Sequence, residues 1–210
     1  MIKAITGQLG PIVQAYMARS KSENDVEALA EVSDNLCPHI LGSYFARAKT
    51  MNVIHLRLGD VLAVGGSGAD RDVNTKRFAS RAVRRPPEPS IEVRAILDAL
   101  GGKGSVRLSP NVTEHSAFVT SLHKSDSKAT ALSIQYLNEI RIGTGIRNIL
   151  SSEDSNKDWC LLVVARLMVA GKGGFSKTAS EVRILRGRPT IYDDATSTYF
   201  NAHATKDTVT

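Results

Sequence analysis

Hydrophobic and polar positions follow a helical period over most of this 210-residue chain. Apolar residues recur at intervals of three and four, which is the spacing of one face of an α-helix. The pattern predicts helices over residues 11–19, 22–33, 41–48, 75–85, 90–100, 111–123, 127–141, 156–170 and 175–186. We therefore expect a mainly α protein of the α+β class.

The period changes to two in one segment, NVIHLRL. There Ile54, Leu56 and Leu58 alternate with polar residues, as in a half-buried β-strand. The following Gly59-Asp60 pair suits a two-residue turn, and the apolar segment VLAV after it suits a returning strand. The sequence thus predicts a small β-hairpin near residues 53–64.

The chain beyond Arg188 is polar with scattered aromatic residues. We expect a helical core domain over residues 1–188 and an extended C-terminal arm over residues 189–210. Four larger side chains in the arm are spaced like anchors that dock on a neighbouring subunit: Ile191, Tyr192, Tyr199 and Phe200. An extended arm of this length reaches roughly 65 Å. Exchanged arms would join many copies into a homo-oligomer.

Composition indicates a soluble protein that stays inside the cell. The longest apolar run, WCLLVVARLMVAG, is too short to span a bilayer and contains Arg166, so no membrane association is expected. Gln8 and Pro11 interrupt the apolar N-terminal segment, which makes a poor signal peptide. Cys37 and Cys160 are far apart and form no CxxC motif, so we expect free thiols in a reducing compartment.

The formal net charge of +6 is concentrated in two segments. Residues 76–110 carry 8 basic and 3 acidic side chains, and residues 161–210 carry 7 and 4. In the predicted helix 75–85, one face presents three arginines and the opposite face is apolar. Because guanidinium groups bind phosphate in a bidentate manner, this pattern favours nucleic acid, with RNA preferred over DNA. The candidate binding residues are Lys76, Arg77, Arg81, Arg84 and Arg85, within the basic segment 76–107, and Lys172, Lys177, Arg183, Arg186 and Arg188. The alternative is a solvated surface that keeps the protein soluble.

A glycine-rich motif, VAGKGGFSKTAS, spans residues 169–180. It fits the phosphate-binding loop pattern G-x-x-x-x-G-K-[ST] at all but one position. The segment KGGFSKT also resembles the deviant Walker-A loop of the ATPases that partition plasmids and place division septa. That resemblance implies that Lys177 holds phosphates, that Thr178 holds magnesium and that Lys172 is the signature lysine.

Three features of the sequence favour a different interpretation of this motif. Ser176 replaces the glycine that lets the backbone approach the phosphates. Arg166 interrupts the preceding apolar run, which suits a helix at least as well as a strand. Only 32 residues follow Thr178, whereas a parallel sheet places most of its strands after such a loop. We therefore predict a glycine-rich hinge between two helices.

Other chemistry has little support in the sequence. The five histidines show no metal-ligand spacing, and no G-x-S-x-G nucleophile motif is present. We expect no catalytic residues, no metal, no cofactor and no enzyme activity.

The leading hypothesis is a structural nucleic-acid-binding subunit, most concretely a viral nucleocapsid or coat protein assembled around RNA. Such a protein would be found in the virion and the host cytoplasm, and a non-viral one in the cytoplasm. The alternatives are a nucleotide-phosphate-binding enzyme that uses loop 171–178, and a small basic adaptor or regulatory domain.

Overall fold

The computed structural model describes residues 10, 23–57, 91–121, 127–150, 154–170, 174–194 and 197–199. The described helices are α2 (Glu23–Leu41), the 3-10 turn η1 (Gly42–Tyr44), α3 (Phe45–Ala48), α5 (Ile91–Gly101), α6 (Pro110–Glu114), α7 (Ser127–Thr144), α8 (Ser155–Val164) and α9 (Gly174–Leu185). The described strands are β1 (Asn52–Arg57), β2 (Ser116–Ser121), β3 (Asn148–Ile149), β4 (Leu167–Ala170), β5 (Thr190–Asp194) and β6 (Ser197–Tyr199). The abundance of helices broadly fits the expected class, but the strands form a larger sheet than the expected hairpin and alternate with helices along the chain.

The described strands form one sheet in the order β3-β2-β1-β4-β5-β6. Strands β1 to β5 are parallel, and β6 pairs with β5 in the antiparallel direction. The chain starts near the centre of the sheet, builds outward to β3, and then returns to β4 and builds toward the other edge. This is the doubly wound arrangement of open α/β sheets.

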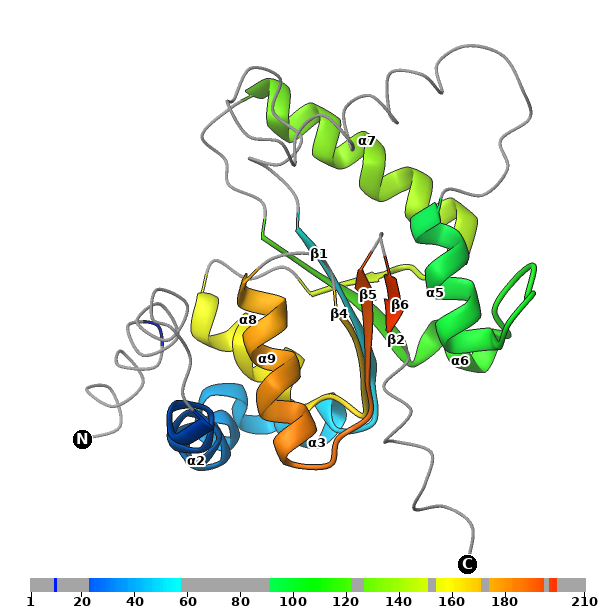
Figure 1. The fold of residues 1–210 in the computed structure, drawn as a ribbon. Helices are drawn as coiled ribbons and strands as arrows, with labels where there is room; N and C mark the ends of the chain where they lie inside the picture. The colour runs from blue at the N-terminus through cyan, green and yellow to red at the C-terminus, as the bar shows by residue number, and fades with distance from the viewer. Residues whose placement is uncertain are drawn as a thin grey trace, which may run out of the picture.

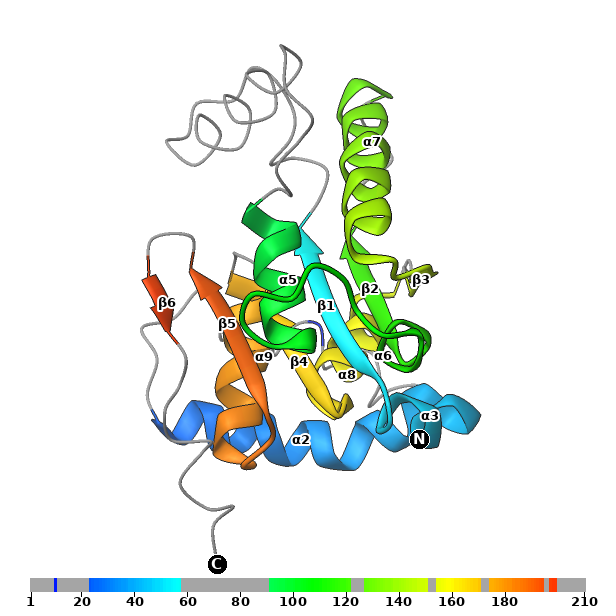
Figure 2. The ribbon, with the colours of Figure 1, turned by 90° about the vertical axis from the view of Figure 1, so that its right-hand side faces the viewer.

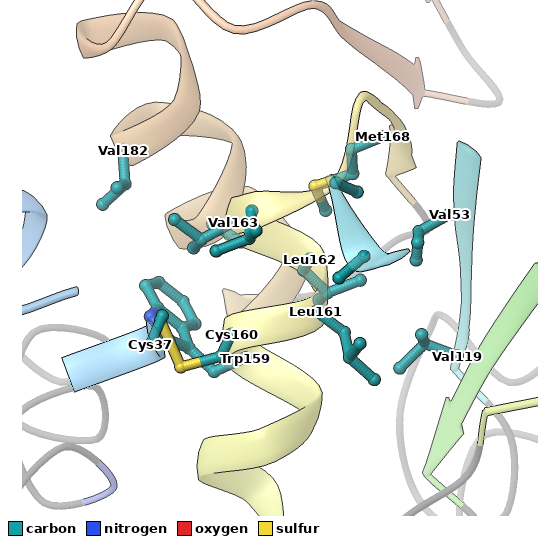
Figure 3. Packing of buried hydrophobic residues seen from close by; sticks show 14 of the residues in the cluster. Cys37, Val53, Val119, Trp159, Cys160, Leu161, Leu162, Val163, Met168 and Val182 are labelled. Atoms are coloured by element: carbon teal, nitrogen blue, oxygen red, sulfur yellow. A yellow bond between two sulfur atoms is a disulfide. The ribbon is translucent and has the colours of Figure 1, made fainter. Parts of the chain in front are cut away.

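Helices cover both faces of the sheet (Figures 1 and 2). Alternate residues of the strands point to opposite faces, so two cores form. The first core joins Val53 of β1 and Met168 of β4 to α2, α8 and α9. The second joins Ile54 and Val169 to α5 and α7. Figure 3 shows α8 within the first core: Leu161 and Leu162 lie on the side of the strand residues Val53 and Val119, and Trp159 and Cys160 lie on the other side, beside Cys37.

The predicted hairpin is wrong in its pairing. Strand β1 pairs in parallel with β2 on one side and with β4 on the other, so it is a central strand of the sheet. The side chains from Asn52 to Leu56 are all buried, including the polar ones. The returning strand expected after residue 60 lies outside the described residues.

Two segments that were each predicted to form one helix instead form a helix followed by a strand. The segment 111–123 contains α6, capped by Ser109, and then β2. The segment 156–170 contains α8 and then β4. Helix α8 begins where the Asp154 side chain accepts a hydrogen bond from the Asn156 amide, a standard N-cap. The helix ends at Ala165 without a glycine or proline, so a tertiary contact must end it.

The C-terminal segment does not begin as a separate arm. Residues 190–194 form β5, which pairs with β4, and β6 then pairs with β5. Ile191 packs against the second core. The expected boundary between residues 188 and 189 therefore falls just before a strand of the central sheet. Phe200 and the residues after it lie outside the described part.

The two cysteines form a disulfide rather than free thiols. Cys37 of α2 and Cys160 of α8 have Cα atoms 5.1 Å apart, and both side chains are fully buried. They are 123 residues apart in the sequence, so spacing gave no sign of the pairing. The bond links α2 to the helix at the centre of the first core, next to Trp159 (Figure 3).

We expect this disulfide to stabilise the fold by about 3–4 kcal/mol, because it closes a long loop in the unfolded chain. Urea unfolding followed by the fluorescence of Trp159, the single tryptophan, measures this effect. Dithiothreitol should lower the unfolding midpoint of the wild type, and should leave a Cys37→Ala/Cys160→Ala variant unchanged. Equal midpoints for the oxidised and reduced wild type would show that the bond contributes nothing.

Candidate functional site: the carboxyl ends of β1 and β4

Strands β1 and β4 lie side by side at the point where the chain reverses direction across the sheet. The connection after β1 leads toward β2, and the connection after β4 leads toward β5 on the other side. In open α/β sheets, ligands bind in the crevice that opens between two such connections, beyond the carboxyl ends of the strands. The candidate site is therefore the end of β1 and β4, which we call the switch point.

The glycine-rich motif lies at this switch point. Strand β4 ends at Ala170, and α9 begins at Gly174. The expected hinge between two helices is thus wrong, because the motif joins a buried parallel strand to a helix. That arrangement is the one a phosphate-binding loop requires. Lys172, within the connection 171–173, lies outside the described residues.

The hydroxyl groups of the motif are engaged inside the protein. The Ser176 hydroxyl hydrogen-bonds to Nδ1 of His55, and both side chains are buried. The Thr178 hydroxyl donates to the Gly174 carbonyl at 2.8 Å, and this side chain is buried as well. The magnesium-binding role that the Walker-A resemblance implies for Thr178 is therefore not open to its hydroxyl. Lys177 is exposed.

Aromatic contacts fix the first turn of α9 against its neighbours. The Phe175 ring lies 5.8 Å from the His55 ring and 5.6 Å from the Trp159 ring, measured between centroids. Trp159 in turn donates a hydrogen bond of 3.0 Å to the Ser33 hydroxyl on α2. The start of α9 is thus held by β1, α8 and α2. Ile54 pairs with Val169, so His55 lies level with the last residue of β4 and next to the switch point.

Sequence reasoning missed the contact between His55 and Ser176. The two residues are 121 positions apart. His55 lacks metal-ligand spacing, and Ser176 was considered only as a missing glycine. A local pattern carries no sign of such a pair, because only the parallel pairing of β1 and β4 brings the two segments together.

Arg183, one of the proposed RNA-binding residues, has a structural role. It is fully buried. Its guanidinium donates to the Thr190 hydroxyl and to the carbonyls of Leu162, Val163, Ala165, Arg166 and Pro189. Leu162 and Val163 belong to the last turn of α8 and Ala165 is its C-cap residue, so Arg183 caps that helix. Burial, with a smaller effect from Arg188, lowers the pKa of Arg183 to about 9, so the group remains a cation at pH 7.

Arg186 and Arg188 are also engaged within the protein. Both bind the Asp34 carboxylate on α2, at 2.6 Å and 3.2 Å. Arg188 donates to the Val163 carbonyl as well. Of the five candidate residues in the second basic segment, Lys172 lies outside the described residues. Lys177 is the only described one that makes no hydrogen bond or ion pair within the protein. The five candidates in the first basic segment lie outside the described residues, as do Lys172 and Phe200.

The structure brings three of the four proposed subunit-contact residues into the sheet of their own chain. Ile191 and Tyr192 lie in β5, and Tyr192 pairs with Tyr199 of β6. The four proposed anchors therefore do not form one free segment. The backbone of three of them is used in strand pairing.

Two comparisons with known proteins assign the chain to no family. No protein-family model matches the sequence, and no curated protein is significantly similar to it. Among the described helices, none is both long enough and apolar enough to cross a membrane. Within the same residues, no group of three or more histidine, cysteine, aspartate or glutamate side chains is placed to hold a metal ion. The fold defines a class, a doubly wound α/β protein. Because a fold does not determine a function, the function has to be inferred from the residues of the site.

Proposed function

We propose that this protein binds a nucleotide through its phosphates at the switch point between β1 and β4. The observation that carries the proposal is the strand order, which places β1 and β4 side by side with their connections running in opposite directions. The general rule for doubly wound sheets locates the ligand there.

The sequence of the two connections supports a phosphate-bearing ligand. The segment after β1 contains Gly-Gly-Ser-Gly at 65–68, and the segment after β4 contains Gly-Lys-Gly-Gly at 171–174. Glycine has no Cβ, so it lets a backbone approach a phosphate closely. Lys172 and Lys177 add positive charge at the second connection.

A mononucleotide fits the chain better than a dinucleotide. The dinucleotide fingerprint sits in a βαβ unit of about 30 residues. Here 58 residues separate the end of β1 from the start of β2, from 58 to 115. Because the Thr178 hydroxyl is buried, we expect binding without magnesium-dependent ATP hydrolysis, and a Lys177→Ala variant should have no such activity to lose.

We expect isothermal titration calorimetry to detect binding of ATP or GTP to the full chain. A Gly174→Asp variant should weaken binding roughly tenfold or more, since a carboxylate at the first residue of α9 repels phosphate. The same carboxylate favours the helix, because acidic groups stabilise helix N-termini. The fold should therefore persist.

The matched control is Ser155→Asp. Ser155 is exposed and is the first residue of α8, so this variant adds the same charge at the same helix position at this end of the sheet, but outside the connection that follows β4. Its affinity should stay closer to that of the wild type than the affinity of Gly174→Asp does. The proposal fails if neither nucleotide binds at about 1 mM, the weak end of specific affinity, or if Gly174→Asp binds like the wild type.

The second candidate is a structural nucleic-acid-binding subunit, including a coat protein that assembles around RNA. The unequal distribution of charge favours it, with 8 basic against 3 acidic side chains in residues 76–110. Assembly has less support than binding, because residues 190–199 include two strands of the protein's own sheet.

A further inference from the structure

Basic side chains gather at the end of the sheet opposite the switch point. In a parallel sheet, every connection that enters a strand lies at the amino ends of the strands. Five such connections, at residues 49–51, 115, 145–147, 165–166 and 186–189, lead into β1 to β5. They contain Lys49, Arg147, Arg166, Arg186 and Arg188, one histidine and no acidic residue. We call this surface the amino edge; in Figure 2 the strands β1 and β5 point upward, away from it.

Not all of these cations are available to a ligand. Arg186 and Arg188 both bind the Asp34 carboxylate, which neutralises one of their two charges and holds both side chains. Arg166 is exposed but donates to the Asn52 side chain at 2.9 Å and 3.2 Å. The side chains of Lys49 and Arg147 are exposed, and neither has a carboxylate partner among the described residues.

The available cations lie beside aromatic rings. Helix α3, which precedes β1, adds the exposed Arg47, whose guanidinium carbon lies 5.6 Å from the centre of the Tyr44 ring. The Lys49 ammonium lies 5.0 Å from the centre of the Phe45 ring. Both rings are only partly buried. Cations next to aromatic rings are the combination that binds unpaired bases and their phosphates.

We propose that the amino edge is a binding surface for single-stranded RNA. The strands are about 4.8 Å apart, so the available cations Arg147 and Lys49, which precede β3 and β1, lie roughly 10 Å apart along this edge, enough to contact two phosphates. This inference rests on the second candidate function, nucleic-acid binding, and it places the contact on residues other than those of the predicted helix 75–85.

The test is the salt dependence of binding to a fluorescent 20-nucleotide oligouridylate, measured by anisotropy. A Lys49→Ala/Arg147→Ala variant should lower the slope of log K against log salt by about 1.4, near 0.7 for each lost phosphate contact. Its thermal unfolding should match that of the wild type, since both side chains are exposed. The matched control is Lys157→Ala/Lys177→Ala, which removes two exposed lysines from the first turns of α8 and α9, at the opposite end. Its slope should not change.

Each other outcome overturns the proposal in a distinct way. If the wild type binds and an Arg77→Ala/Arg81→Ala/Arg84→Ala variant alone lowers the slope, nucleic-acid binding stands and the amino edge is the wrong surface. If only the control lowers the slope, RNA binds at the switch-point end. If the wild type does not bind the oligonucleotide, the second candidate function fails as well. Binding of the amino edge to phosphatidylserine vesicles without RNA binding would identify a membrane surface instead.

Discussion

Replacing Arg183 by methionine should lower the free energy of unfolding by about 4 kcal/mol or more, which is close to the whole stability of a marginal domain. The substitution removes the arginine donor from the buried carbonyls of Leu162 and Ala165. The Val163 carbonyl also loses one donor but keeps its hydrogen bond from Arg188. An unsatisfied buried polar group costs about 1–3 kcal/mol, and several are created together. The end of α8 and the starts of β4 and β5 would lose their common contact.

Urea unfolding followed by circular dichroism and Trp159 fluorescence measures the effect. Arg183→Lys should fall in between, because an ammonium keeps the charge but has three donors and no planar fork. The matched control is Arg186→Ala, which removes a partly exposed ion pair with Asp34 and should cost less than about 1 kcal/mol. A methionine variant within 1 kcal/mol of the wild type would refute the capping role.

The low pKa of Arg183 predicts how this contribution varies with pH. Its pKa of about 9 in the folded protein lies below the ordinary value of an arginine because burial disfavours the cation. Below pH 8 the arginine is protonated in both the folded and the unfolded chain, so it adds no pH dependence there. At pH values between the folded and the unfolded pKa of Arg183, the unfolded chain binds more protons than the folded chain. The contribution of this group to the free energy of unfolding therefore increases with pH in that range.

The same arginine explains why the sequence predicted one helix over residues 156–170. The run from Trp159 to Ala170 is apolar with one exception and contains neither glycine nor proline. From Asp158 to Val164 helix α8 is buried on all sides, so its hydrophobic pattern there carries no helical period. The break between α8 and β4 is set by hydrogen bonds from Arg183, at least 17 residues further along the chain. No local pattern can report such a contact.

Amphipathic helices were predictable. The expected helices at 90–100, 127–141 and 175–186 are confirmed as α5, α7 and α9, with no end displaced by more than three residues. Each has one face on a core and one face toward solvent, which produces a clear period. Strand β4 has four residues and β3 has two, too few to show a period of two. The candidate site depended on those strands, so the sequence indicated the glycine-rich motif but not its position at a switch point.

Truncation after Arg188 should unfold the protein. If residues 189–210 formed an arm exchanged between subunits, the truncated protein would instead stay folded and soluble but would no longer assemble. The structure shows that residues 190–194 form β5 beside β4, so the truncation removes two strands and leaves the edge of β4 unpaired. It also removes the Pro189 carbonyl and the Thr190 hydroxyl that accept hydrogen bonds from Arg183, and the Ile191 side chain from the second core. We expect loss of the cooperative thermal transition by circular dichroism and larger, irregular particles by light scattering.

The matched control is truncation after Phe200, which keeps β5 and β6 and should retain the wild-type transition. A truncated chain ending at Arg188 that melts cooperatively near the wild-type temperature would show that β5 is dispensable, and would restore the arm as the element that joins subunits.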